Sequence, residues 1–220
     1  MQLAYWPIKG IIEPIRYLLA YVKQDYEEIN FADWDEYIDR RQPFDLPFAN
    51  LPFIVDGHVK LTESKAILQY IAAKHDASLL GSTDKDRVQV RVLIGVMADV
   101  VKAYSDNIIK KTGQKAGIEV GLEKYKTIEK LELLSKYLGD KEYFNGYITV
   151  NDFEWACIVY RVWAYSRTFD LTSPIEKFPN LIAHMEKIKG LPSIKEYLTS
   201  DKAKLPIHTK GYLPVDIKED

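Results

Sequence analysis

The stretch Asn50-Leu51-Pro52-Phe53-Ile54-Val55-Asp56-Gly57 is followed shortly by Val59-Lys60-Leu61 and then by Thr62-Glu63-Ser64. Residues 53–55 form a short apolar run that is typical of a buried strand. Asp56-Gly57 is a turn pair that favours a tight hairpin, so residues 59–61 are predicted to be the partner strand. Ser64 then opens a helix, because the apolar residues after it recur at helical spacing: Ile67, Tyr70 and Ile71. The stretch therefore predicts a ββα unit.

The residues that precede this unit predict a βαβ unit. Leu3-Ala4-Tyr5-Trp6 is a short apolar run that stops at Pro7 and Gly10, as a buried strand ending in a turn does. An amphipathic helix is expected next, with Pro14 tolerated in its first turn and an apolar stripe made of Ile15, Leu18, Leu19 and Val22. A second strand is expected over residues 26–31. The polar stretch from Asp33 to Ala49, which carries Pro43 and Pro47, is predicted to be an irregular loop.

Long helical patterns replace the strands from about residue 84 onward. One stripe contains Leu93, Val96, Met97, Val100 and Val101, and a second contains Ile128, Leu131, Leu134 and Leu138. Thr149 and Asp152 form a Thr-x-x-Asp capping signal before a mostly apolar helix, which we expect in the core of a second domain. A last helix is expected around Leu181, His184, Met185 and Ile188. We predict an α/β domain over residues 1–80 and an all-helical domain over residues 84–208, with a tail to residue 220 and a linker within residues 76–86.

Composition excludes several classes of protein. The 220 residues are 47% apolar and 28% charged, with a formal net charge of −2, so no basic surface for nucleic acid is indicated. No apolar run approaches the length of a membrane span, and the N-terminus lacks the pattern of a secretory signal. Cys157 is the only cysteine, which excludes an intrachain disulfide and a CxxC redox pair. The four histidines have no metal-ligand spacing. We expect a cytoplasmic protein that binds neither nucleic acid nor membranes.

The ordered motifs resemble the cytosolic glutathione transferase family over nearly the whole chain. Tyr5-Trp6-x-Ile8-Lys9-Gly10, with Arg16-Tyr17-Leu18-Leu19 after it, is similar to the opening of the mu class. The segments at residues 50–52, 56–57 and 62–67 resemble the glutathione-binding half of the family, and Thr149-x-x-Asp152 resembles its helix cap. Ala32-Asp33-Trp34 is more similar to the sigma class, and Leu205-Pro206-Ile207 to the pi class. The resemblance implies a thioredoxin-like first domain followed by an all-helical second domain.

The family resemblance also implies the reaction. A transferase of this kind conjugates the thiolate of reduced glutathione to hydrophobic electrophiles in detoxification, with glutathione as co-substrate and with no other cofactor and no metal. Tyr5 is the implied catalytic residue. Because a free thiol titrates near pKa ~8.5, a hydroxyl that donates a hydrogen bond to the sulfur favours the thiolate. Without the resemblance, Tyr5 would be read as a strand tyrosine packed in the core.

The same resemblance implies two sets of binding residues. The glutathione-binding set combines residues of the first domain with one carboxylate from the partner subunit of a homodimer, and it contains Tyr5, Trp6, Trp34, Arg40, Arg41, Asn50, Leu51, Pro52, Glu63, Ser64 and the partner-supplied Asp99. Trp34 or Tyr37, with Arg40 or Arg41, is expected near the glycine carboxylate, and Leu51-Pro52 is expected to be a cis peptide. The electrophile pocket is expected to contain Trp6, Ile8, Tyr104, Ile108 and Tyr212.

Two other functions remain open from the sequence. One is a non-catalytic relative that binds glutathione or another ligand, or that serves as a structural protein like the lens crystallins of this family. The other is a glutathione-dependent isomerase such as a prostaglandin D synthase, because fold alone does not choose among reactions at such a site. A thiol–disulfide oxidoreductase is disfavoured, because Cys157 lies outside the first domain.

Overall fold

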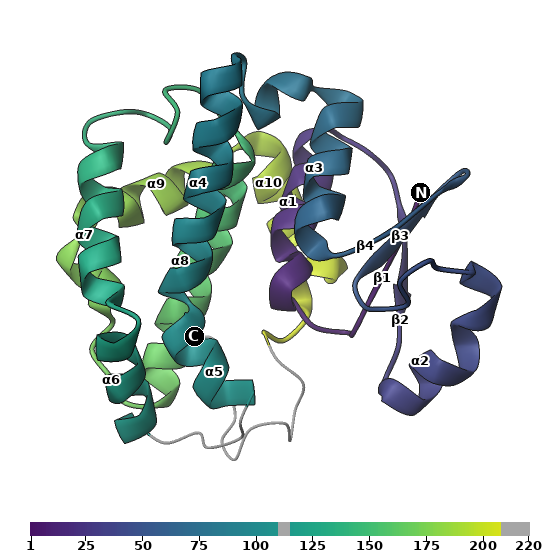
Figure 1. Ribbon diagram of the computed structural model, residues 1–220, viewed down its shortest axis with the longest axis horizontal. Helices are drawn as coiled ribbons and strands as arrows, with labels where there is room; N and C mark the ends of the chain where they lie inside the picture. The colour runs from purple at the N-terminus through teal and green to yellow at the C-terminus, as the bar shows by residue number, and fades with distance from the viewer. Residues whose placement is uncertain (110–114, 208–220) are drawn as a thin grey trace. The chain divides into compact units, whose positions relative to one another are not determined.

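The computed structural model of the chain describes residues 1–109 and 115–207. Two compact units are present (Figure 1). The first contains Met1–Ala77 together with the described residues from Pro192 onward, and the second contains the described residues of Ser78–Leu191. No helix within these described ranges is long and apolar enough to cross a membrane.

The first unit is built on a four-stranded mixed sheet. Its strands are β1 (Gln2–Tyr5), β2 (Glu27–Asn30), β3 (Phe53–Asp56) and β4 (Val59–Thr62), in the spatial order β2-β1-β3-β4. β1 and β2 are parallel, whereas β3 is antiparallel to both β1 and β4. The βαβ and ββα units predicted from the sequence are therefore confirmed, and the central strands β1 and β3 carry the buried apolar residues.

Helices cover both sides of this sheet. In Figure 1, α1 (Glu13–Tyr21) and α3 (Ser64–His75) lie side by side on one face, while α2 (Trp34–Arg40) lies on the opposite side. Short 3-10 turns occur in the unit at Gly10–Ile12 and Gln42–Phe44, and a third at Ala77–Leu80 begins at its last residue before the boundary. The C-terminal segment adds α10 (Pro192–Thr199) and the turn Asp201–Lys204.

The helix α2 corrects the sequence analysis, in which residues 33–49 were predicted to be an irregular loop. Asp33 is its N-cap, and the carboxylate of Asp33 accepts a hydrogen bond from the backbone N–H of Glu36 at 2.9 Å. Glu36 in turn forms an ion pair with Arg40 one turn later. Tyr37 is the one fully buried side chain of this helix, so the apolar stripe is too short to stand out in the sequence. In the sequence, the start of this helix is marked by the Asp-x-x-Glu signal at Asp33 and Glu36.

The second unit is all-helical around one buried helix. This helix, α8 (Val150–Thr168), packs against α4 (Asp84–Val100) and α9 (Pro179–Lys189), and its residues are buried almost throughout its length. The other helices with described bounds are α5 (Lys102–Ile109), α6 (Lys115–Lys124), α7 (Thr127–Leu138) and the short turn Pro174–Lys177. The four residues whose spacing predicts a last helix are the buried residues of α9: Leu181, His184, Met185 and Ile188.

A buried capping box begins α8, as the Thr-x-x-Asp signal predicts. The carboxylate of Asp152 accepts hydrogen bonds from the backbone N–H of Thr149 at 2.7 Å and from that of Phe144 at 3.1 Å. His184 Nε2 on α9 lies 2.7 Å from the same carboxylate. One fully buried side chain thus joins the start of α8, the preceding loop and α9.

The division of the chain differs from the sequence expectation at its C-terminal end. The expected helical domain extended to residue 208, but the described residues from Pro192 onward belong to the first unit. The physical reason is that α10 packs against α1, and this contact joins parts of the chain that are far apart in sequence. The first boundary, between Ala77 and Ser78, falls inside the segment 76–86 that we expected to be the linker.

The two capping boxes of the second unit allow a matched test of how burial changes the contribution of a cap to stability. We expect Asp152→Ala to lower the free energy of unfolding by about 3–5 kcal/mol, because the buried donors of Thr149, Phe144 and His184 lose their acceptor. Asp86→Ala removes the equivalent carboxylate from the capping box of α4, which lies near the surface, and should cost only about 0.5–1 kcal/mol. Urea unfolding of both variants measures the difference, and equal losses would contradict this assignment.

Candidate active site

Tyr5 is the last residue of β1, and the turn after it packs directly against its ring. The side chain is 7% exposed. Gly10, which ends this turn, has φ +48°, and a Cβ atom at this position would lie 2.7 Å from Cε1 and 3.0 Å from the hydroxyl oxygen of Tyr5. Only glycine combines this left-handed backbone with so close an approach. The turn therefore determines where the phenol lies.

The register of the sheet brings the predicted glutathione-binding segments to one edge. Ala4 of β1 pairs with Phe53 of β3, and Phe53 pairs with Thr62 of β4, so these three residues form one row across the sheet. Because β3 runs antiparallel to its neighbours, Tyr5, Pro52 and Glu63 all follow that row at the same end. Figure 1 shows this end of the strands, from which the chain continues towards α1, α2 and α3.

The segment before β3 is tied to the segment before α3. The Leu51–Pro52 peptide is cis, as expected, and Leu51 is buried. The side-chain amide of Asn50 donates a hydrogen bond to the carboxylate of Glu63, at 3.2 Å. Glu63 has φ +71° and occupies the N-cap position of α3, so Ser64 is the first helical residue rather than the cap. Ser64 therefore lies at the positive end of the helix dipole, where an anion is favoured.

An aromatic cluster lies between the Tyr5 turn and α2. The ring of Trp6 is 6.3 Å from both Trp34 and Tyr37, and the rings of Trp34 and Tyr37 are 5.2 Å apart. Tyr37 is fully buried, whereas Trp34 is 54% exposed. The sequence left open which of these two side chains would take part in binding. The exposure of Trp34 makes it the side chain that is accessible to a ligand.

The two arginines of this region are held differently. Arg40 forms an ion pair with Glu36 and lies 5.2 Å above the ring of Phe31. Two hydrogen bonds, first from the backbone N–H of Ala32 and then from Arg40, keep the pKa of the Glu36 carboxyl below its usual value. Arg41 lies over the ring of Tyr37 and lines a small cavity of about 230 Å³ beside residues 42–49. Arg40 is therefore already paired with a carboxylate, whereas Arg41 packs on an aromatic ring.

The site residues predicted in the second unit differ in how far they are buried. The carboxylate of Asp99 on α4 is 41% exposed and lies 2.9 Å from Lys130 Nζ. Tyr104 on α5 is fully buried, its hydroxyl lies 3.1 Å from that of Ser166, and burial raises its pKa to about 12. α5 also contains Ile108, but the side chain of Ile108 and the whole of Tyr212 lie outside what the structure describes.

Ile8, which was predicted for the electrophile pocket, is buried in the first unit. Within the described residues, no group of three or more histidine, cysteine, aspartate or glutamate side chains is arranged to hold a metal ion.

The chain joins a four-stranded βαβ-ββα unit, with a tyrosine at the end of its first strand, to an all-helical unit. This is the arrangement of the two-domain transferases, which combine a thioredoxin-like domain with a helical domain. The family model for the N-terminal domain of glutathione S-transferases matches residues 1–73, and that for the C-terminal domain matches residues 98–201. The chain belongs to the glutathione S-transferase family and is an enzyme of this type.

Relatives of known name support this assignment. The chain is 34% identical to glutathione S-transferase Mu 1 of Oryctolagus cuniculus, with 96% of each chain covered. It is 32% identical to the class-mu 26 kDa isozyme of Schistosoma japonicum, over 91% of this chain and 88% of that one. These matches agree with the mu-like motifs of the sequence.

Solved structures share the fold. The glutathione S-transferase Blo t 8 aligns with a TM-score of 0.75 at 23% identity, over 96% of this chain and 97% of that one. Rat hPGDS, solved in complex with a quinoline, aligns with a TM-score of 0.73 at 24% identity, over 95% of this chain and 98% of that one.

The glycine that packs against Tyr5 allows a matched pair of substitutions. Gly10→Ala should lower glutathione-dependent turnover by at least about tenfold, because the added methyl group displaces the phenol. Gly57→Ala is the control: Gly57 has a similar φ of +62°, but nothing lies within 4 Å of the added methyl group. Both variants should lose comparable stability from backbone strain. Equal turnover in the two variants would show that Gly10 is only a turn residue.

Proposed function

We propose that this chain conjugates the thiolate of reduced glutathione to hydrophobic electrophiles, as a detoxifying enzyme of the cytoplasm. The observation that carries the proposal is the row of residues across the sheet, after which Tyr5, Pro52 and Glu63 lie at one edge. A hydroxyl, a backbone segment and a helix N-terminus are the groups that a peptide thiol with two carboxylates requires.

In this proposal Tyr5 is the catalytic residue. Its hydroxyl donates a hydrogen bond to the sulfur of glutathione and so favours the thiolate over the thiol. The thiolate then attacks the electrophilic carbon and forms a carbon–sulfur bond. In a substitution the leaving group departs with its bonding electron pair. In an addition to an enone the π electrons of the double bond move onto the carbonyl oxygen, and the resulting enolate takes up a proton from solvent. The position of Tyr5 against the Gly10 turn supports this role, because the phenol has little freedom to move away.

The rest of the tripeptide is assigned to the neighbouring segments. The backbone of Leu51 pairs with the cysteinyl residue, while Ser64 and the start of α3 hold the γ-glutamyl carboxylate, and the carboxylate of Glu63 faces the γ-glutamyl ammonium. Asn50 supports Glu63 through their hydrogen bond. We assign the glycine carboxylate to the α2 side of the site, where the candidates are Trp6, Trp34, Arg40 and Arg41. Arg41 is favoured because Arg40 is already paired with Glu36.

The electrophile is proposed to bind near Trp6, Ile8, Tyr104, Ile108 and Tyr212, which are apolar or aromatic residues. Apolar lining of this kind suits hydrophobic acceptors. Glutathione is the co-substrate, and the proposed chemistry requires no other cofactor.

Replacement of the catalytic hydroxyl tests the proposal. Tyr5→Phe should keep the fold and the affinity for glutathione but raise the pH midpoint of the bound thiolate by about one to two units, because a hydrogen bond to a charged acceptor contributes about 1.5–3 kcal/mol. Turnover of an aryl halide at neutral pH should fall in parallel. The ultraviolet absorbance of the thiolate, measured against pH in the presence and absence of glutathione, provides the midpoint. An unchanged midpoint would exclude Tyr5 as the activating group.

We further propose that the enzyme is a homodimer in which Asp99 of one subunit completes the glutathione site of the other. Phe48 is 80% exposed, and Phe44, four residues earlier, packs on Phe53 with 4.7 Å between the rings. Val88 and Val92, one turn apart on α4, are also exposed apolar residues. Such surfaces are typical of protein interfaces, and two-fold dimers are the commonest assembly.

Charge removal on α4 tests the shared site. Asp99→Asn should weaken glutathione binding by about three- to tenfold, because the amide oxygen can still accept a hydrogen bond and only the charge is lost, and it should leave the dimer intact. Asp84→Asn removes the same charge from the first turn of α4, where the side chain is exposed, and should not change the affinity. Titration calorimetry with glutathione and sedimentation velocity provide the two measurements. A monomer at micromolar concentration would contradict the dimer, and equal affinities would remove Asp99 from the site.

A further inference from the structure

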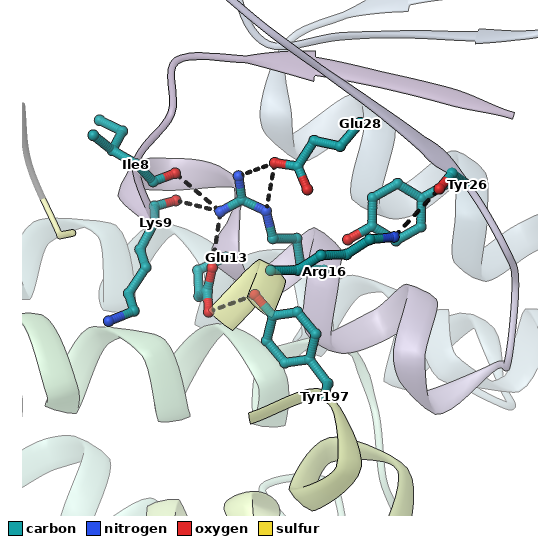
Figure 2. A network of polar contacts seen from close by, with 8 residues as sticks. Ile8, Lys9, Glu13, Arg16, Tyr26, Glu28 and Tyr197 are labelled. Carbon is teal, nitrogen blue, oxygen red and sulfur yellow. Dashed lines mark hydrogen bonds and ion pairs between the residues drawn. The ribbon is translucent and has the colours of Figure 1, made fainter. Parts of the chain in front are cut away.

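Arg16, on α1, is a completely buried cation that lies behind the Tyr5 turn. Figure 2 shows its guanidinium between two carboxylates. Nη1 donates to Glu13 at 3.0 Å, and Nε and Nη2 both donate to Glu28, the former at 3.1 Å. Burial opposes the charge of Arg16, but Glu13 and Glu28 outweigh that effect and raise its pKa. The cation is thus present at every working pH.

The same guanidinium holds two backbone carbonyl groups of the turn. Nη1 donates to the carbonyl oxygen of Ile8 at 3.0 Å and to that of Lys9 at 3.3 Å, as Figure 2 shows. These residues immediately precede Gly10, which packs against the phenol of Tyr5. Arg16 therefore contacts the turn from its carbonyl side.

The C-terminal segment holds the same turn from its amide side. The N–H of Lys9 donates to the carbonyl oxygen of Pro206 at 2.7 Å, and the N–H of Gly10 donates to that of Ile207 at 3.3 Å. Two consecutive turn residues are therefore bonded to a part of the chain that lies nearly 200 residues later in the sequence.

Tyr197 on α10 joins these two sets of contacts. Its hydroxyl donates to Glu13 at 2.9 Å, on the carboxylate oxygen that Arg16 does not use (Figure 2). Tyr197 is buried, and its ring packs edge-on against Tyr17 of α1. A continuous series of hydrogen bonds therefore connects α10 to the Tyr5 turn through Tyr197, Glu13 and Arg16.

We propose that Arg16, Glu13 and Tyr197 are positioning residues for catalysis, through which the C-terminal segment 192–207 fixes the turn that places the hydroxyl of Tyr5. The inference rests on the proposed role of Tyr5 in thiolate formation. None of the three side chains touches glutathione in this scheme. Their effect is to keep the carbonyl groups of Ile8 and Lys9, and hence Gly10, against the phenol.

The direct test is Arg16→Lys, which keeps the charge but loses the planar fork that joins two carboxylates to two carbonyl groups. We expect the pH midpoint of bound thiolate to rise by roughly half a unit to one unit, as a less well placed hydroxyl stabilises the thiolate less. Amide hydrogen exchange at Lys9 and Gly10 should accelerate by about three- to tenfold, the size expected for one weakened hydrogen bond. The KM for glutathione should change by less than about twofold, because the residue makes no contact with it.

Tyr197→Phe keeps the test decisive even if Arg16→Lys fails to fold. It removes one hydroxyl that donates to a carboxylate, and it should change the midpoint and the exchange in the same direction by a smaller amount. Tyr70→Phe is the matched control, because the hydroxyl of Tyr70 donates to Asp56 at 2.8 Å in the same unit, away from the Tyr5 turn. It should alter neither the thiolate midpoint nor the exchange at Lys9 and Gly10.

The outcomes separate this inference from the proposed function. Faster exchange at Lys9 and Gly10 with a raised midpoint supports the positioning role. Unchanged exchange in both network variants overturns it, and so does faster exchange with an unchanged midpoint, provided that Tyr5→Phe shifts the midpoint in the wild-type background. If Tyr5→Phe itself leaves the midpoint unchanged, the proposed role of Tyr5 fails and the positioning role falls with it. A melting temperature that drops without either change indicates a purely structural network and also overturns the inference.

Discussion

A cation that has no access to water must be surrounded by acceptors, and the first unit is organised around that requirement at Arg16. The desolvation of a buried charge costs several kcal/mol unless paired carboxylates and further hydrogen bonds offset it. Those acceptors come from α1, from β2 and from the turn after β1, through Glu13, Glu28 and the carbonyl groups of Ile8 and Lys9. Loss of any of these elements leaves a buried charge uncompensated, so they are held in one arrangement.

The parts of the fold that follow from local physics were predictable from the sequence. The hairpin at Asp56-Gly57, the apolar stripe of α9 and the capping box at Asp152 each depend on residues that are close in sequence. The helix α2 was missed, because a stripe with one buried residue has no recognisable period and only the cap at Asp33 marks it. The assignment of α10 to the first unit was unpredictable for a different reason. It depends on contacts with α1 that no local pattern encodes.

The candidate site shows the same division. Family motifs identify Tyr5, Leu51-Pro52 and Ser64, but the register that brings their segments to one edge of the sheet is a property of strand pairing. Adjacent arginines at residues 40 and 41 look equivalent in the sequence. They differ in the structure because Glu36 is one helical turn before Arg40 and pairs with it. Arg16 enters the sequence analysis only as part of a family motif, and its connection to Tyr197 through Glu13 depends on the folded chain.

Because the first unit is discontinuous in sequence, it affects the order in which the two units can fold during translation. Glu13 and Tyr197 are 184 residues apart in sequence. At about 5–20 residues per second, roughly 10–40 s separate their emergence during translation. The helical unit is synthesised in that interval and has time to fold first. The sheet unit, although its strands are translated earliest, has to wait for α10 and the segment after it before the charge of Arg16 and the amides of Lys9 and Gly10 have all their partners. Among the residues that the structure describes, those that complete the first unit are therefore the last to be translated.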